Sequence, residues 1–232
     1  MKELQVEAHT LGISLTKAQI KVFETYYNDL EAWNKNVNLT NITGEENVVI
    51  KHFLDSLTVA IVLAANTHML LDIGSGAGFP GIPVKIVRPE IKITLLEAVA
   101  KKVSFLEYCI AKLKLHDIQA VHGRAEDFGH DPKYREQYDV VTARAVAHLS
   151  ILIEYALPFL RVGGLCIAQK MNNPEEITEA KDALEILGGK IKKIVPITIS
   201  GLQGRCLVLI EKMRATDEKY PRRPGLPSKR PL

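Results

Sequence analysis

The chain has 232 residues, of which 47% are hydrophobic and 25% charged, with a formal net charge of +3 at pH 7. A chain of this length buries enough surface to fold without disulfides or metals, and no stretch approaches the ~20 apolar residues that cross a bilayer. The three cysteines fit neither a disulfide framework nor a metal site, and the N-terminus lacks the apolar core of a signal peptide. We therefore expect buried thiols, no metal and a cytoplasmic protein.

Residues 1–66 are predicted to form a helical segment packed on the main domain. Thr16 and Gln19 have the spacing of a capping box, which marks a helix start. Apolar residues follow at helical spacing: Ile20, Phe23, Tyr27, Leu30 and Trp33. The stretch 34–43, rich in asparagine and threonine, interrupts this pattern, and a second helix is expected across 45–64.

From residue 67 to 213 the pattern alternates between strands and helices. Five apolar runs that read as strands are separated by helix-length segments: 69–74, 91–98, 118–124, 138–145 and 163–170. Such alternation is typical of a buried parallel sheet. The last two runs, 190–199 and 204–212, are too close for a crossover and predict a hairpin. The predicted fold is α/β, with a mostly parallel seven-stranded sheet and an antiparallel terminal hairpin.

The C-terminal tail, 214–232, is basic and rich in proline. Residues 212–232 hold seven Lys and Arg against two acids, so this end has a net charge of +5 while the rest of the chain sums to −2. Contact with a polyanion through the tail would therefore be local. Composition alone is equally compatible with a disordered tail.

The glycine-rich stretch "LDIGSGAGFPGIP" follows the first predicted strand. Gly74, Gly76 and Gly78 permit positive φ and a close approach of ligand to the main chain, and the following helix offers free N–H groups. Residues 76–81 even satisfy G-x-G-x-x-G, which makes a dinucleotide one candidate. A P-loop is excluded because no Gly-Lys-Ser/Thr follows. S-adenosyl-L-methionine is the other candidate.

Asp72 favours adenosylmethionine over a dinucleotide. A carboxylate just before the loop would repel a pyrophosphate but would attract the ammonium and sulfonium of adenosylmethionine. Pro80 contributes no N–H to an anion at the start of the helix. The terminal hairpin stands where a dinucleotide-binding fold would have its second half, and this also favours adenosylmethionine.

Acidic residues stand where two further strands are predicted to end. Glu97 has the spacing expected of an acid that binds a ribose, which both candidate ligands carry. After the next strand, Glu126 or Asp127 could accept a hydrogen bond from an adenine amino group, and the Ala125 N–H could donate to a ring nitrogen. These strand ends converge in a parallel sheet.

Arg144 ends the fourth predicted strand, where a methyl acceptor would lie. Arginine is no base at neutral pH, but it suits a phosphate or a guanine edge. His148 could act as a base, although a structural histidine is the simpler interpretation. Neither Asn-Pro-Pro-Tyr nor a Pro-Cys dipeptide is present. A site without an obvious base fits guanine N7, whose lone pair is already free, and the catalytic residue itself stays unassigned.

Six segments resemble the bacterial RsmG (GidB) family from about residue 30 to the C-terminus: "NVNLTNIT", "HFLDSL", "LDIGSGAGFPGIP", "LLEAVAKKVSFL", "YDVVTARAVA" and "YPRRPG". The resemblance implies a class I methyltransferase with a Rossmann-like fold. It would transfer a methyl group from S-adenosyl-L-methionine to guanine N7 at the 527-type position, in the 530 loop of 16S rRNA in the small ribosomal subunit.

The resemblance also implies particular site residues. Those at matching cofactor positions are Gly74, Phe79, Ala125, Glu126 and Arg144, with Glu97 near the ribose. RNA contacts would come from Lys101, Lys102, Arg222 and Arg223. A monomer that binds rRNA and no membrane is expected. The rival functions are a dinucleotide-dependent oxidoreductase, a non-catalytic ribosome-assembly factor and a small-molecule methyltransferase.

Overall fold

The computed structural model describes residues 1–232 and contains one seven-stranded sheet in the order β3-β2-β1-β4-β5-β7-β6. The strands are β1 (Met69–Ile73), β2 (Lys92–Glu97), β3 (Ile118–His122), β4 (Tyr138–Arg144), β5 (Leu160–Met171), β6 (Gly189–Pro196) and β7 (Arg205–Lys212). The first five pair in parallel, whereas β7 is antiparallel to both of its neighbours. The predicted fold class is confirmed. The hairpin loop covers 197–204, longer than expected, because β6 ends at Pro196 and β7 begins only at Arg205.

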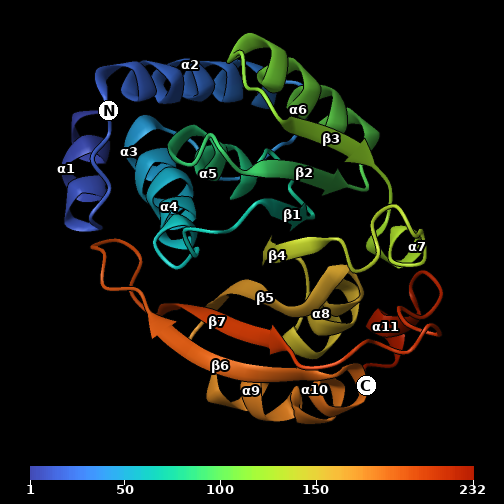
Figure 1. The fold of residues 1–232 in the computed structure, drawn as a ribbon. Coiled ribbons are helices and arrows are strands. Elements are labelled where there is room, and N and C mark those ends of the chain that lie inside the picture. Colours follow the sequence, from blue (N-terminus) through green and yellow to red (C-terminus); the bar gives the residue numbers. More distant parts are fainter.

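Helices cover both faces of the sheet (Figure 1). They are α1 (Lys2–Thr10), α2 (Lys17–Asn34), α3 (Glu45–Val48), the π-helix η1 (Val49–Leu54), α4 (Asp55–Ala60), α5 (Gly81–Val87), α6 (Ala100–Lys112), α7 (Ala125–Phe128), α8 (Leu149–Ala156), the 3-10 turn η2 (Leu157–Phe159), α9 (Pro174–Glu179), α10 (Lys181–Leu187) and α11 (Leu226–Lys229). Successive side chains of a strand point to opposite faces of the sheet. Leu70 packs with the helices before β3, and Leu71 packs with α8 and α10.

The N-terminal helices are only partly those predicted. The capping box at the start of α2 is confirmed, because the Gln19 N–H donates to Thr16 Oγ1 (3.2 Å) and the Thr16 N–H donates to Gln19 Oε1 (3.0 Å). The second predicted helix, 45–64, is interrupted by the wide turn η1 and ends at Ala60. Such π-turns are frequent at functional sites, and hydrophobic spacing does not reveal them.

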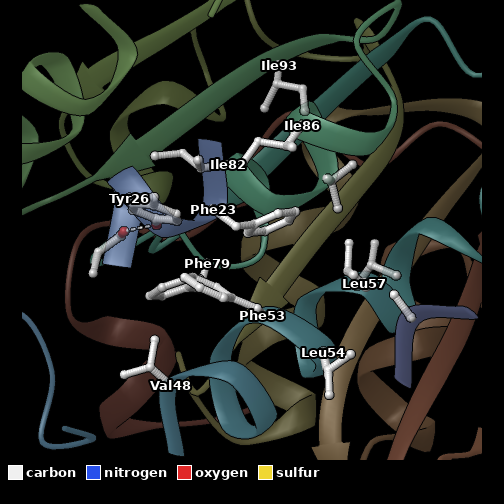
Figure 2. Close-up of a cluster of buried hydrophobic side chains, with 14 of the residues drawn as sticks. Phe23, Tyr26, Val48, Phe53, Leu54, Leu57, Phe79, Ile82, Ile86 and Ile93 are labelled. Carbon is white, nitrogen blue, oxygen red and sulfur yellow. Dashed lines mark hydrogen bonds between the residues drawn. The ribbon is translucent and has the colours of Figure 1, made fainter. Parts of the chain in front are cut away.

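Aromatic rings join the N-terminal helices to the glycine-rich loop (Figure 2). Phe79 of the loop lies 5.4 Å from Tyr26 of α2 and 6.0 Å from Phe53 of η1, measured between ring centroids. Phe23 completes the group at 5.0 Å from Phe53. The phenol of Tyr26 donates to the carbonyl of Ala77, inside the loop. The N-terminal segment and the loop therefore share one buried core.

The C-terminal segment is folded against the sheet domain, where it lies beside α7 in Figure 1. Arg135 holds it by donating to the carbonyls of Thr216 (2.7 Å) and Tyr220 (2.8 Å). The ring of His130 lies 2.6 Å from the carbonyl oxygen of Pro221. These bonds satisfy carbonyl groups that a tail in solvent would leave to water.

Two predictions from composition concern the whole chain. The three cysteines, Cys109, Cys166 and Cys206, are free and buried, as expected of structural thiols. No helix is both long enough and apolar enough to span a membrane.

Candidate functional site

The glycine-rich loop connects β1 to α5 and needs glycine at two positions in particular. Gly74 has a φ of 65°, and a Cβ there would lie 2.8 Å from Val146. Gly78 has a φ of 95°, and a Cβ there would lie 2.5 Å from Ile82. A side chain at either position would be strained and would displace a neighbour. The loop is therefore a compact turn whose main chain stays bare.

Asp72 lies beneath this loop rather than on its open side. Its side chain is fully buried, and Oδ2 accepts a hydrogen bond from the Gly81 N–H (3.0 Å) at the start of α5. Oδ1 is buried without a partner. Burial raises the pKa of this carboxyl to about 7. The direct contact with a ligand ammonium expected for Asp72 is not part of this geometry, and it stays a prediction.

Glu97, at the end of β2, connects the loop with the next strand. Its carboxylate accepts from the Gly76 N–H through Oε2 and from the Val99 N–H through Oε1, both at 2.8 Å. The side chain is only 6% exposed. Each carboxylate oxygen has a second acceptor site, so these bonds leave capacity for a ligand hydroxyl.

A cavity of about 190 Å³ opens between these strand ends. Its lining combines apolar and carboxylate side chains with bare main chain: Ile73, Gly74, Leu96, Glu97, Ala98, Gly123, Arg124, Ala125, Glu126, Val146 and Tyr155. The structure thus brings together four of the predicted cofactor residues, Gly74, Glu97, Ala125 and Glu126. Larger hollows lie elsewhere, on the outer side of β3 and α6, away from the strand ends.

Ala125 and Glu126 begin the short helix α7, next to this cavity. At the first position of α7 the Ala125 N–H has no carbonyl of its own helix to bind. Glu126 is 6% exposed, and its Oε1 accepts from the N–H of Gly225 (3.1 Å) in the C-terminal segment. The carboxylate is therefore held in place by the C-terminal segment. No sequence pattern connects these two residues.

Arg144 lies in a dense polar cluster formed with η1 and α4. Its Nη1 donates to the Lys51 carbonyl (2.9 Å) and to Asp55 Oδ2 (3.1 Å), and its Nη2 lies 2.8 Å from His52 Nδ1. The guanidinium carbon lies 5.0 Å from the ring centre of Phe79. Arg144 therefore contacts both the glycine-rich loop and the N-terminal segment, and the latter contact was not predicted.

His52 is the central histidine of this cluster. Because arginine can only donate, His52 Nδ1 is the acceptor, and Nε2 carries the proton that it donates to Thr40 Oγ1 (2.8 Å). Burial, and then the charge of Arg144, lower the pKa of His52 to about 3, so the ring is neutral at pH 7. The ring also stacks on Phe79, with centroids 4.3 Å apart and planes at 11°.

Sequence reasoning missed Thr40, His52 and Asp55 as site residues. They lie in "NVNLTNIT" and "HFLDSL", which carried the family resemblance but no chemical role. The only available signal was that resemblance, because no local pattern connects Asp55 to an arginine 89 positions later. His148, considered as a base, is 40% exposed with its Nε2 3.2 Å from Glu179. It takes no part in the cluster.

The residues expected to contact RNA fall into two kinds. Lys101 and Lys102 occupy the first turn of α6, close behind Glu97, and Arg223 is exposed. Arg222 differs, because its guanidinium is paired with Glu154 of α8, whose side chain is 1% exposed. A phosphate would have to compete with this buried carboxylate. Arg223 is therefore more accessible to a phosphate than Arg222, and RNA contact by these residues stays a prediction.

Known proteins similar to this chain identify its family. Residues 19–203 match the family model described as rRNA small subunit methyltransferase G. A relative of that name from Acetivibrio thermocellus is 47% identical over 235 residues, covering 100% of this chain and 97% of the relative. Another, from Pelotomaculum thermopropionicum, is 49% identical and covers 97% of this chain and 95% of the relative.

Solved structures share the fold at low sequence identity. The ribosomal protein L11 methylase of Lactobacillus delbrueckii has a TM-score of 0.56 at 14% identity, covering 74% of this chain and 81% of its own. The precorrin-6y C5,15-methyltransferase of Geobacter metallireducens has a TM-score of 0.54 at 14% identity, covering 75% and 95%. These likenesses show a class I methyltransferase fold. The family model and the relatives, which match most of the chain, show that it belongs to the rRNA small subunit methyltransferase G family.

Proposed function

We propose that this protein transfers a methyl group from S-adenosyl-L-methionine to N7 of a guanine at the 527-type position, in the 530 loop of 16S rRNA. Membership of the family supports methylation of small-subunit rRNA. The observation that carries the residue-level proposal is the convergence at one edge of the sheet. There the glycine-rich loop, Glu97 and the start of α7 surround a cavity, while Arg144 lies beside the loop residue Phe79.

The cavity has the chemistry that an adenosyl group requires. Glu97 keeps acceptor capacity for the ribose hydroxyls, and the Ala125 N–H could donate to an adenine nitrogen. Val146 and Leu96 offer apolar walls for the base. At Gly74 a side chain would meet Val146 and fill this space. These residues fit adenosylmethionine, which supplies an electrophilic methyl group when bound.

Guanine N7 suits a site whose polar groups are donors rather than bases. N7 carries a free lone pair, so no proton has to be removed before attack, and alignment is the main requirement. His52 cannot act as a base here, because Nδ1 accepts from Arg144 and Nε2 already carries a proton. Arg144 uses three of its five N–H donors within the protein. The other two can position a guanine edge or a phosphate.

Basic side chains near the site would hold the RNA. Lys101, Lys102 and Arg223 are the proposed phosphate contacts, and they would fix orientation without reading sequence. The target guanine would be splayed from a loop to reach Arg144. With a ribosomal RNA substrate, we propose that the protein acts in the cytoplasm as a monomer.

Methyl transfer to small subunits that lack their native guanine-N7 mark tests the proposal. Tritiated adenosylmethionine supplies the label, and borohydride–aniline cleavage maps the product. A single new cleavage in the 530 loop is the expected result. Arg144→Met should reduce kcat/KM by about 100-fold, as expected for loss of a positioned donor. The control is Arg161→Met, because this arginine pairs with Asp139 at the opposite end of β4 and β5.

Other outcomes would favour the rival functions. Label elsewhere in the RNA would keep the methyltransferase but contradict the 530 loop as target. Cofactor binding without transfer would favour a non-catalytic assembly factor. Transfer to small molecules alone would favour a small-molecule methyltransferase, in which the basic residues would have no role. NADH fluorescence enhancement without adenosylmethionine binding would favour an oxidoreductase.

A further inference from the structure

Glu154 of α8 anchors the C-terminal segment through a single residue. Its carboxylate accepts from the Arg222 main-chain N–H (2.8 Å), Nε (2.9 Å) and Nη2 (2.6 Å). The Glu154 side chain is 1% exposed and that of Arg222 is 21% exposed. A forked, charge-assisted pair of this kind fixes orientation as well as distance. Arg222 therefore sets where the chain after it passes over α8.

The residues that follow Arg222 hold two walls of the cavity. Gly225, at a φ of 79°, directs its N–H to Glu126 Oε1 (3.1 Å). The Ser228 hydroxyl lies 3.1 Å from the Tyr155 hydroxyl. Glu126 and Tyr155 both line the cavity at the strand ends. Two lining side chains are thus restrained from outside by one short stretch of chain.

We propose that Arg222 is a positioning residue of the cofactor site: by pairing with Glu154 it orders residues 222–228, which hold Glu126 and Tyr155 in place for the adenosyl group. This inference rests on the proposed function, because it takes adenosylmethionine as the ligand. It gives Arg222 a role different from the RNA contact implied by the sequence resemblance. The neighbouring Arg223 is exposed and forms no ion pair, so it stays the RNA candidate.

Single substitutions of the two adjacent arginines separate these roles. Calorimetry would give the Kd of the full-length protein for adenosylmethionine, and filter binding would give its affinity for small subunits. Arg222→Ala should raise the cofactor Kd by about tenfold or more, the size expected when a hydrogen-bonded lining group loses its restraint. KM for the cofactor should rise while kcat at saturating cofactor changes little. Arg223→Ala should leave the cofactor Kd within about twofold and weaken RNA binding.

Arg222→Ala leaves a buried carboxylate unpaired and could unfold the protein. The double variant Arg222→Met with Glu154→Leu removes both charges, so it should stay folded yet still bind the cofactor about tenfold more weakly. A wild-type Kd in the folded double variant would overturn the proposal. So would loss of RNA affinity alone in Arg222→Ala. If the wild type itself binds no adenosylmethionine, both the proposed function and this inference fail. If the wild type binds it and the double variant binds it equally well, only this inference fails.

Discussion

Asp72 offers the sharpest test of the buried electrostatics beneath the glycine-rich loop. Burial raises its pKa from the ordinary 3.8 to about 7 in the folded protein. The folded state therefore binds one more proton than the unfolded state between about pH 4 and pH 7. Stability from this group is present at low pH and is lost as the pH rises through 7. Between pH 5 and pH 8 the loss integrates to about 2–3 kcal/mol.

Asp72→Asn should remove this pH dependence while keeping an oxygen for the Gly81 N–H. Urea unfolding of wild type and variant from pH 5 to pH 8 measures it. His52 titrates with the opposite sign, because its pKa is lowered to about 3 and its contribution falls as the pH drops below 6.5. Only the difference between the two proteins therefore isolates Asp72. We expect that difference to favour the variant increasingly toward pH 8.

A flat difference across this range would refute the reasoning, since Asp72 would then ionise normally in the folded protein. Asp139→Asn is the matched control, because hydrogen bonds from two main-chain N–H groups and the charge of Arg161 lower the pKa of Asp139. Its stabilising effect should be lost toward acid pH instead. Repeating the series with saturating S-adenosylhomocysteine tests the expected ammonium contact: if the ligand's ammonium lies beside Asp72, the pH dependence should disappear.

Three other substitutions test the site and its support. Glu97→Ala should raise the Kd for adenosylmethionine by about 10- to 100-fold, since charge-assisted hydrogen bonds contribute about 1.5–3 kcal/mol; calorimetry measures it. Asp55→Ala should lower the free energy of unfolding by about 3 kcal/mol, because Arg144 loses a buried partner. In a double-mutant cycle with Arg144→Met, additive losses of unfolding free energy would contradict this. Gly78→Ala should lower the free energy of unfolding, measured in urea, by about 2–3 kcal/mol. Gly163→Ala should lower it by about 1 kcal/mol, because Gly163 has a similar φ but open space where the Cβ would lie. Equal losses would contradict the steric conflict inferred at Gly78.

Much of the fold could be predicted because its signals are local. Apolar runs of strand length, separated by helical segments, gave all seven strands to within a few residues, and the short gap before 204–212 indicated the hairpin. The start of α2 followed from a capping box that two hydrogen bonds confirm. The interruption of 45–64 by η1 could not be predicted, because residues 52–60 are all buried and show no one-sided apolar pattern in which the wider turn would appear as a shift.

The candidate site was predictable where it depends on topology alone. Gly74, Glu97 and Ala125 lie at or just after the ends of parallel strands, and such strand ends meet at one edge of the sheet. The direction in which a side chain points is a different matter. Asp72 precedes the loop as expected, yet its carboxylate turns to the Gly81 N–H. Arg222 and Arg223 are adjacent and of the same residue type, so only the fold shows that Glu154 lies beside Arg222.

The polar cluster around Arg144 could not be predicted from the sequence, and it explains the strained backbone of Ala145. Ala145 has a φ of 55°, a conformation that costs an L-amino acid about 1–2 kcal/mol. Such strain persists only when neighbouring contacts determine the backbone. The three bonds from Arg144 to Lys51, His52 and Asp55 supply those contacts. All three partners come from the N-terminal segment, so this segment fixes the Arg144 side chain as well as burying the loop. Under the proposed function, the helices before the sheet would therefore belong to the methyl-transfer site, although the glycine-rich loop and its acids lie entirely after them.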